Sequence, residues 1–272
     1  MSRVAHSVQE YWRKQRGLML ALPAEVETGE TDAVHDLRAA GRRLKATIRV
    51  YRPLLRPKLS EWLLAELDWF NAELGKARDA EVIHEQLAEL LSGYPEAQSL
   101  LDTLAARQEH LRLDAIEMLD DDRVTGLVSA LEGFVHRPWR RTLDTQQEDT
   151  SRQQILGRID WARGRVLKAW RDADADSDAE RAGLHLLRRR AKATRYAFES
   201  VSNGYPQAVP QVRFYAELSE LLGVVQDAAM VEDALTAYPG ELAQIAIAEQ
   251  YRRATKAESS ARDLLRAGLP EI

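Results

Sequence analysis

The chain has 272 residues, 45% of them hydrophobic and 30% charged, with a net charge of −5. These values are typical of a soluble globular protein with a sizeable core. The absence of cysteine excludes disulfides and thiolate metal sites and favours the cytoplasm. No apolar signal core and no run of about 18 apolar residues occurs, so we expect no membrane association.

Prolines, glycines and polar runs divide the first half into helices. The first expected helix covers residues 4–22 and ends before Pro23. Thr31 or Asp32 caps a central helix that ends near Pro53. Pro57 opens a helix to about residue 74, which joins or bends into another that ends near residue 91. Two more helices are expected at 95–119 and 122–136.

The second half repeats this order after a polar boundary at residues 144–151. A helix is expected at 152–170, and Ser177 with Glu180 forms a capping box for a helix that ends near residue 203. Further helices are expected at 209–222 and from Pro239 to about residue 267. Because strand signals are absent, we predict an all-α fold. We expect two antiparallel helical bundles, at 1–145 and 146–272, related by a pseudo-twofold repeat.

The central helix of the first half carries a basic face. At 100° per residue, five basic-type side chains fall within about 80° of one another: His35, Arg38, Arg42, Lys45 and Arg49. A separate apolar stripe contains Leu37, Gly41, Leu44, Ile48 and Tyr51. Gly41 narrows this stripe, which would let another helix come close. A basic stripe about 21 Å long suggests a linear anion as ligand.

The same pattern recurs about 150 residues later. His185, Arg188, Lys192 and Arg195 repeat the basic offsets, and Leu187, Ala191, Thr194 and Phe198 repeat the apolar ones. Residues 34–52 carry a net charge of +5 and residues 184–200 carry +4, so the rest of the chain carries −14. Two basic helices in an acidic chain favour local binding of one kind of polyanion over general nucleic-acid binding.

A second segment also occurs twice. ELGKARDAEVI at 73–83 and LLGVVQDAAMV at 221–231 align Gly75 with Gly223 and Asp79 with Asp227. Together with VHDLRAAGRRLK at 34–45 and LHLLRRRAKATRYA at 184–197, these segments resemble the CHAD family, the α-helical domain named after its histidines. The resemblance covers nearly the whole chain. It implies a two-bundle fold that binds inorganic polyphosphate through basic helix faces and associates with polyphosphate granules.

The resemblance implies a binding site in a groove lined by both central helices. The residues expected to bind polyphosphate are His35, Arg38, Arg42, Arg43, Lys45, Arg49, Arg78, His185, Arg188, Arg189, Lys192 and Arg195. The second copy departs from the pattern, because Ala193 replaces a basic residue and Gln226 stands where the first copy has Arg78. Arg189 and Arg190 add charge, but at about 40° and 140° from His185 they point away from the stripe.

Several roles stay open. The two histidines either donate to phosphate or only orient the arginines. Asp79 and Asp227 are expected to cap a helix or orient basic side chains, not to act as acid–base groups. The aspartates at 172–178 imitate a calcium loop, but Ser177 and Gly183 break its pattern. We therefore expect no catalytic residue, no metal site and no cofactor.

Three rival functions remain. An enzyme acting on phosphoanhydrides would need metal-binding carboxylates beside the cations, and none converge on the stripes in sequence. A nucleic-acid binder would interleave aromatic residues with the basic stripe, and the six tryptophans do not do so. A scaffold would bring the basic faces to an acidic partner. The oligomeric state is not predicted.

Overall fold

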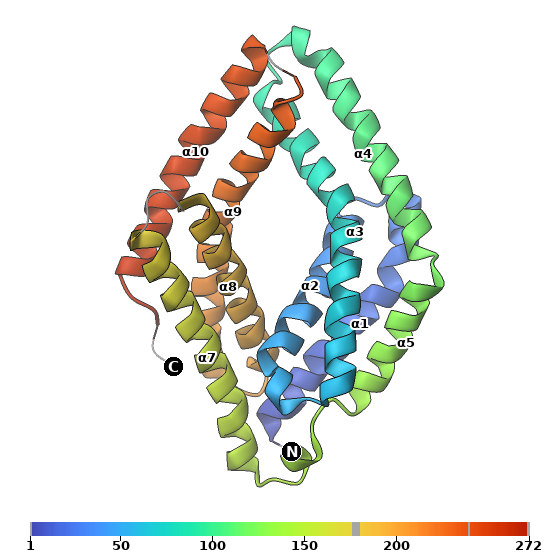
Figure 1. Ribbon diagram of the computed structural model, residues 1–272, viewed down its shortest axis with the longest axis vertical. Helices are drawn as coiled ribbons and strands as arrows, with labels where there is room; N and C mark the ends of the chain where they lie inside the picture. Colours follow the sequence, from blue (N-terminus) through green and yellow to red (C-terminus); the bar gives the residue numbers. More distant parts are fainter. Residues whose placement is uncertain (1, 176–179, 239, 271–272) are drawn as a thin grey trace.

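The computed structural model describes residues 2–175, 180–238 and 240–270, and these residues are predominantly helical and form no β-strand (Figure 1). The predicted all-α class is therefore confirmed. The α-helices are α1 (Arg3–Thr28), α2 (Ala33–Tyr51), α3 (Pro57–Leu90), α4 (Gln98–Leu119), α5 (Asp122–His136), α6 (Arg141–Asp144), α7 (Glu148–Ala175), α8 (Glu180–Val201), α9 (Val209–Leu235) and α10 (Glu241–Arg266). Short 3₁₀ turns cover Arg52–Leu54, Pro95–Ala97 and Pro206–Ala208.

Helix α1 extends beyond the predicted end at Pro23 and continues to Thr28. Proline removes one backbone hydrogen bond from a helix, but the buried Leu22 and Val26 hold the turns on both sides of it against the core. The helix ends at Gly29, whose φ of 75° is a conformation that glycine adopts without a steric cost. The Gly29 N–H bonds to carbonyl groups of the last turn.

The predicted caps of the two basic helices have different outcomes. Asp32 is the N-cap residue of α2, but its side chain makes no capping hydrogen bond, and its φ is 64°. The capping prediction is therefore right in position and wrong in mechanism, because the left-handed backbone at Asp32 replaces the extended conformation of an ordinary N-cap. The capping box at Ser177 and Glu180 lies outside the residues whose side chains the structure describes.

The long helices α3 and α9 each run without interruption through the repeated Gly–Asp segment. Of the two alternatives for residues 73–83, joining or bending, the structure therefore shows joining. The polar boundary between the halves is partly helical, because α6 ends at its first residue, Asp144, and α7 already begins at Glu148.

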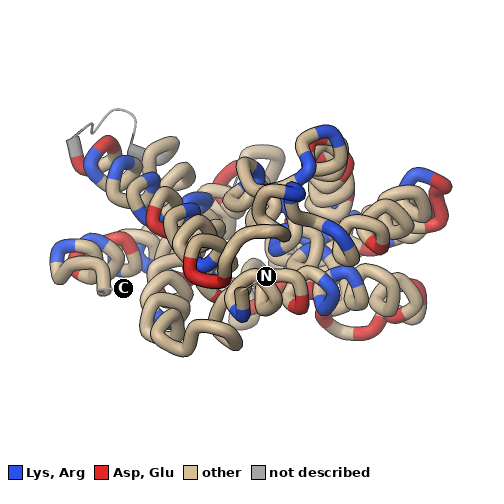
Figure 2. The backbone as a smooth tube through the Cα atoms, turned by 90° about the horizontal axis from the view of Figure 1, so that it is seen from below, with Lys and Arg blue, Asp and Glu red and all other residues tan. Residues whose placement is uncertain are grey.

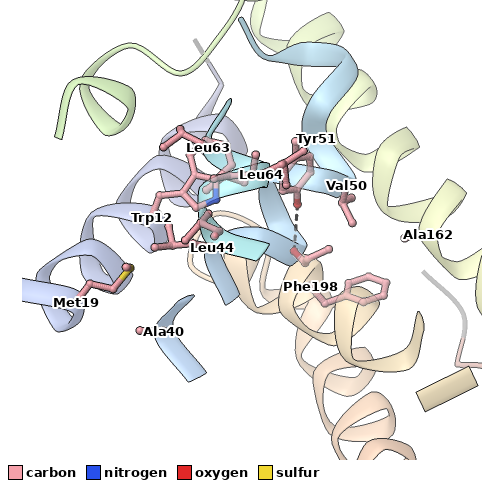
Figure 3. Close-up of a cluster of buried hydrophobic side chains, with 14 of the residues drawn as sticks. Trp12, Met19, Ala40, Leu44, Val50, Tyr51, Leu63, Leu64, Ala162 and Phe198 are labelled. Atoms are coloured by element: carbon pink, nitrogen blue, oxygen red, sulfur yellow. Dashed lines mark hydrogen bonds between the residues drawn. The ribbon is translucent and has the colours of Figure 1, made fainter. Parts of the chain in front are cut away.

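The two halves share a core where α2 meets α8. A single buried cluster contains residues of both halves, including Leu44, Tyr51 and Phe198 (Figure 3). The Tyr51 hydroxyl lies 3.1 Å from the carbonyl oxygen of Ala197, to which it donates, and 3.0 Å from Ser200 Oγ. Burying these polar groups requires such partners, so the bonds fix how the two helices pack.

The long helices diverge from this core and meet again at the far end of the molecule (Figure 1). A second buried cluster lies there, formed by α3 and α4 of one half and α9 and α10 of the other, and includes Leu87, Leu104, Val231 and Leu235. Arg253 Nη2 of α10 also lies 3.1 Å from a carboxylate oxygen of Glu89 in α3. The halves are therefore joined at both ends.

Candidate functional site

The two faces predicted for α2 are both present. Leu37, Leu44, Ile48 and Tyr51 are fully buried, whereas the arginines and Lys45 of the basic stripe keep partial contact with solvent. The predicted close approach at Gly41 is confirmed. A Cβ at Gly41 would lie only 3.0 Å from Asn71 Oδ1 and 3.1 Å from a Phe70 ring carbon, so α3 packs directly against this position.

Helix α8 is built in the same way. Leu187, Ala191, Thr194 and Phe198 are fully buried. With this stripe held in the core, Arg188 and Lys192 remain at the partly exposed face of α8. Helices α2 and α8 contact each other, and the charges of Arg38 and Arg42 act on Arg188, so the basic faces of the two helices come together across the halves.

Each half seats one arginine on a glycine of its neighbouring helix. The Arg38 guanidinium lies across Gly75 of α3, with Nη2 3.3 Å from the position of a Cβ, and Nη1 donates to Asp79 Oδ1 at 3.1 Å. Arg188 lies across Gly223 of α9 with the same 3.3 Å spacing. The Nε atoms of both arginines are buried without a hydrogen-bond partner among the described residues. Both arginines therefore have an unsatisfied hydrogen-bond donor.

Arg42 and Lys192 add positive charge between these two arginines. Neither forms an ion pair with a carboxylate of the described residues. Burial, followed by the positive charges of Arg42 and Arg188, lowers the pKa of Lys192 to about 7. The shift shows that the cations of both halves lie close enough to repel one another. An anion entering this region would relieve that repulsion.

Arg78 of α3 completes what we call the basic cluster, formed by Arg38, Arg42, Arg78, Arg188 and Lys192. Its Nη1 atom lies 2.6 Å from Glu81 and 3.8 Å from Glu85. Burial raises the pKa of Asp227, while the positive charges of Arg188, Lys192 and Arg78 oppose that rise. The pKa values of Asp227 and Arg38 both respond to Arg78, so its charge acts on the elements of both halves.

The remaining predicted residues lie around the basic cluster, mostly with partners of their own. Lys45 and Arg49 both pair with Asp68 of α3, and Arg195 Nε lies 2.7 Å from Glu199. Arg43 lies over the Tyr196 ring at 5.8 Å from the centroid. Arg189 is exposed.

Each histidine lies near the residue that precedes the repeated aspartate of the neighbouring helix. This residue is Arg78 for His35 and Gln226 for His185. Burial and the positive charge of Arg78 lower the pKa of His35 below its ordinary 6.5. The ring nitrogen Nδ1 of His185 lies within hydrogen-bond distance of Gln226 Oε1, which accepts. Both rings are exposed, so either role predicted for them remains compatible with their positions.

Sequence reasoning missed two features of this site. The repeated glycines are visible in the sequence, but nothing there shows that each one makes room for an arginine. Asp68, which neutralises the end of the α2 stripe, belongs to no repeated segment. The expectation that Asp79 orients a basic side chain is confirmed by its bond to Arg38.

Charge is distributed unevenly over the molecule (Figure 2). Seen from below, basic segments lie in the middle of the molecule as well as on outer helices. Within the described part of the chain, no group of three or more His, Cys, Asp or Glu side chains is placed to hold a metal ion. In the same part of the chain, no helix is long and apolar enough to cross a membrane.

Two solved structures have a fold similar to that of this chain. PptA from Streptomyces chartreusis is 19% identical with a TM-score of 0.75, over 96% of this chain and 98% of that one. The CHAD domain from the plant Ricinus communis is 18% identical with a TM-score of 0.75, over 97% of this chain and 90% of that one. At these identities the likeness concerns the fold alone.

Sequence comparison gives the family. Two uncharacterized proteins from two strains of Mycobacterium tuberculosis are each 29% identical over 177 residues, or 61% of this chain. The match covers 33% of each relative, so the chain spans about a third of the length of the curated relatives it matches. The profile of the CHAD domain matches residues 10–236, which is most of the chain. The chain therefore belongs to the CHAD-domain family.

Proposed function

We propose that the basic cluster binds inorganic polyphosphate, and that the protein is a binding protein rather than an enzyme. The observation that carries this proposal is the convergence of cations from both halves. Arg38 and Arg188 are seated on glycines with buried, unpartnered Nε atoms. Arg42 and Lys192 form no ion pair with a carboxylate of the described residues, although the charge of Asp227 acts on Lys192.

The chemistry of the cluster suits a chain of phosphates. Each guanidinium offers a planar set of donors that matches phosphate oxygens, and Lys192 adds a compact charge. Because the cations come from α2, α3 and α8, a linear anion could contact them in succession. The family's implied affinity for polyphosphate agrees with this arrangement, and granule association is part of the same proposal.

A titration of polyphosphate into two matched variants tests the proposal. Arg42→Gln with Lys192→Gln removes one unpaired cation from each half. Lys14→Gln with Lys256→Gln removes the same charge from exposed positions on α1 and α10. We expect the first variant to lose about ten-fold or more in affinity, since each charged contact contributes about 1.5–3 kcal/mol, and the second to bind almost normally. Equal losses in both variants would contradict a localised site.

A second experiment tests whether the protein only binds polyphosphate or also cleaves it. Long-chain polyphosphate incubated with the protein and Mg²⁺ or Mn²⁺ is expected to release no phosphate above the protein-free rate. Release that disappears in the Arg42→Gln, Lys192→Gln variant would overturn the non-catalytic assignment while keeping polyphosphate as the ligand.

A further inference from the structure

Helix α7 carries a third basic stripe that the proposed site does not use. Arg158, Trp161, Arg165 and Lys168 follow one another at intervals of three, four and three residues. These are the intervals that begin both predicted stripes, at His35 and at His185. On a helix they place the four side chains within about 80° of one another, over a length of about 15 Å.

The tryptophan in this stripe is exposed, and the guanidinium groups of two arginines lie over its ring. Trp161 keeps 41% of its surface exposed. The Arg158 guanidinium lies 4.2 Å from its ring centroid, and that of Arg165 lies 5.4 Å away. Arg158 Nε also donates to the carbonyl oxygen of Val50 in α2, at 2.8 Å. These contacts restrain the guanidinium groups while leaving hydrogen-bond donors on their Nη atoms.

Helix α8 adds Arg189 and Arg190 beside this stripe. Burial and then the positive charges of Arg165, Arg189 and Arg49 lower the pKa of Arg190, and no carboxylate is among the groups acting on it. Arg158, Arg165, Arg189 and Arg190 form no ion pair with a carboxylate of the described residues.

Two cations of α1, by contrast, are neutralised. Arg13 pairs with Glu10, and Arg16 pairs with Glu132 at 2.8 Å. An unpaired group of like charges is electrostatically unfavourable until an anion binds it. The face formed by α7 and α8 therefore presents four arginines that no carboxylate of the described residues neutralises.

Arg49 joins this face to the site already described. It is the last residue of the α2 stripe, and its charge acts on Arg190 of α8. Arg49 pairs with Asp68 of α3, and beyond this pair a chain that follows the α2 stripe meets the further arginines of α7 and α8. We name Arg49, Arg158, Trp161, Arg165, Arg189 and Arg190 the outer arginine surface.

We propose that the outer arginine surface binds the part of a long polyphosphate chain that extends beyond the basic cluster. This inference rests on the proposed function, since it concerns the same ligand. Single-stranded nucleic acid fits less well, because Arg158 and Arg165 lie over the Trp161 ring, where a stacked base would have to lie. Phosphate oxygens need only the guanidinium edges.

The test compares a short chain, no longer than one stripe, with a long chain on three proteins. The outer variant carries Arg165→Gln, Arg189→Gln and Arg190→Gln, and the cluster variant carries Arg42→Gln and Lys192→Gln. We expect the outer variant to bind the short chain normally and the long chain about ten-fold more weakly, with its salt slope reduced by about 2. The cluster variant should lose affinity for both.

Each alternative result has a distinct meaning. Wild-type affinity of the outer variant for the long chain would overturn this inference and leave the proposed function intact. Failure of the wild-type protein to bind either chain would overturn both. Single-stranded DNA that competes as well as polyphosphate at equal phosphate concentration, and only when the outer arginines are present, would reassign the surface to nucleic acid and overturn the inference.

Two further measurements guard against a folding defect. Arg189→Gln alone changes only an exposed side chain. It should still lower the affinity for the long chain and leave the affinity for the short chain unchanged. Tryptophan fluorescence should change when the long chain binds, change less with the short chain, and lose this difference in Trp161→Phe. The same fluorescence change in wild type and Trp161→Phe would show that the ligand does not reach this surface.

Discussion

At the scale of single residues, two glycines determine how the site is built. An alanine in place of Gly75 or Gly223 would bring a methyl group to 3.3 Å from an arginine Nη2 atom. The arginine would have to move by a few tenths of an ångström. Glycine also weakens a helix by about 0.5–1 kcal/mol relative to alanine. Both glycines therefore make their helices less stable, but they leave the space that the arginine side chains occupy.

We expect Gly75→Ala and Gly223→Ala to weaken polyphosphate binding several-fold without lowering the melting temperature. The displaced guanidinium explains the first effect, and the higher helix propensity of alanine explains the second. Gly126→Ala in α5 is the matched control, because nothing lies within 4 Å of its added Cβ. If the control loses as much affinity as the two variants, Gly75 and Gly223 have no special role in binding.

Lys192 should make binding depend on pH. Its pKa of about 7 in the free protein rises when an anion binds, because the anion favours the charged ammonium. Affinity should therefore be constant below about pH 6.5 and fall as the pH rises from 7 towards 8.5. In Lys192→Arg the side chain stays charged, so the decline should largely disappear. An unchanged decline in that variant would assign the dependence to another group.

The lowered pKa of Lys192 also makes the stability of the folded protein depend on pH. Stability should rise with pH, whereas affinity for polyphosphate should fall. Lys192 has a lower pKa in the folded protein than its ordinary 10.5, so folding disfavours its charged form. This cost is absent above about pH 10.5 and is fully present below about pH 7. Lys192→Met should therefore raise the free energy of unfolding at pH 6 by an amount on the order of 1–2 kcal/mol after screening, and the melting temperature with it. Thermal unfolding of both proteins at pH 6 measures this.

At the scale of elements, α2 separates its structural and binding faces. Arg42→Glu with Lys45→Glu changes only the basic face, whose side chains are not part of the fully buried stripe. Helicity should stay unchanged, and affinity should fall by about 1.5–3 kcal/mol for each lost contact. Circular dichroism and titration measure the two effects. A folded variant with normal affinity would exclude α2 from the site.

The two faces of α2 were predictable because they depend only on helical periodicity. The approach of another helix at Gly41 was also predictable, because glycine lies on the apolar stripe, but the sequence did not identify that helix as α3. The pairing of Lys45 and Arg49 with Asp68 was not, because it depends on the register between α2 and α3. The end of α1 was also missed, since the burial of Val26 on the far side of Pro23 is a tertiary effect.

At the scale of the whole molecule, the two halves contact each other at both ends. The shared core around Tyr51 and the second cluster around Leu87 fix the spacing of the basic helices. The sequence repeat predicted two related halves, and Arg38 on Gly75 and Arg188 on Gly223 make equivalent contacts. The resemblance predicted a groove lined by both central helices, but the sequence did not show that Lys192 would be buried beside Arg42 and Arg188, where their charges lower its pKa.

The central claim is that both halves contribute to one polyphosphate site. A long chain that contacts the first half should engage the second at a high effective concentration, whereas a short chain gains nothing from the second half. Affinity per chain should therefore rise steeply with chain length and then level off.

Affinity for polyphosphates of defined length, measured for the wild type and for Arg188→Gln, Lys192→Gln, Arg195→Gln, tests this most directly. The triple variant is expected to lose much more affinity for long chains than for short chains, which can still bind the first-half stripe. Equal losses for short and long chains would show that the two halves do not act as linked parts of one site.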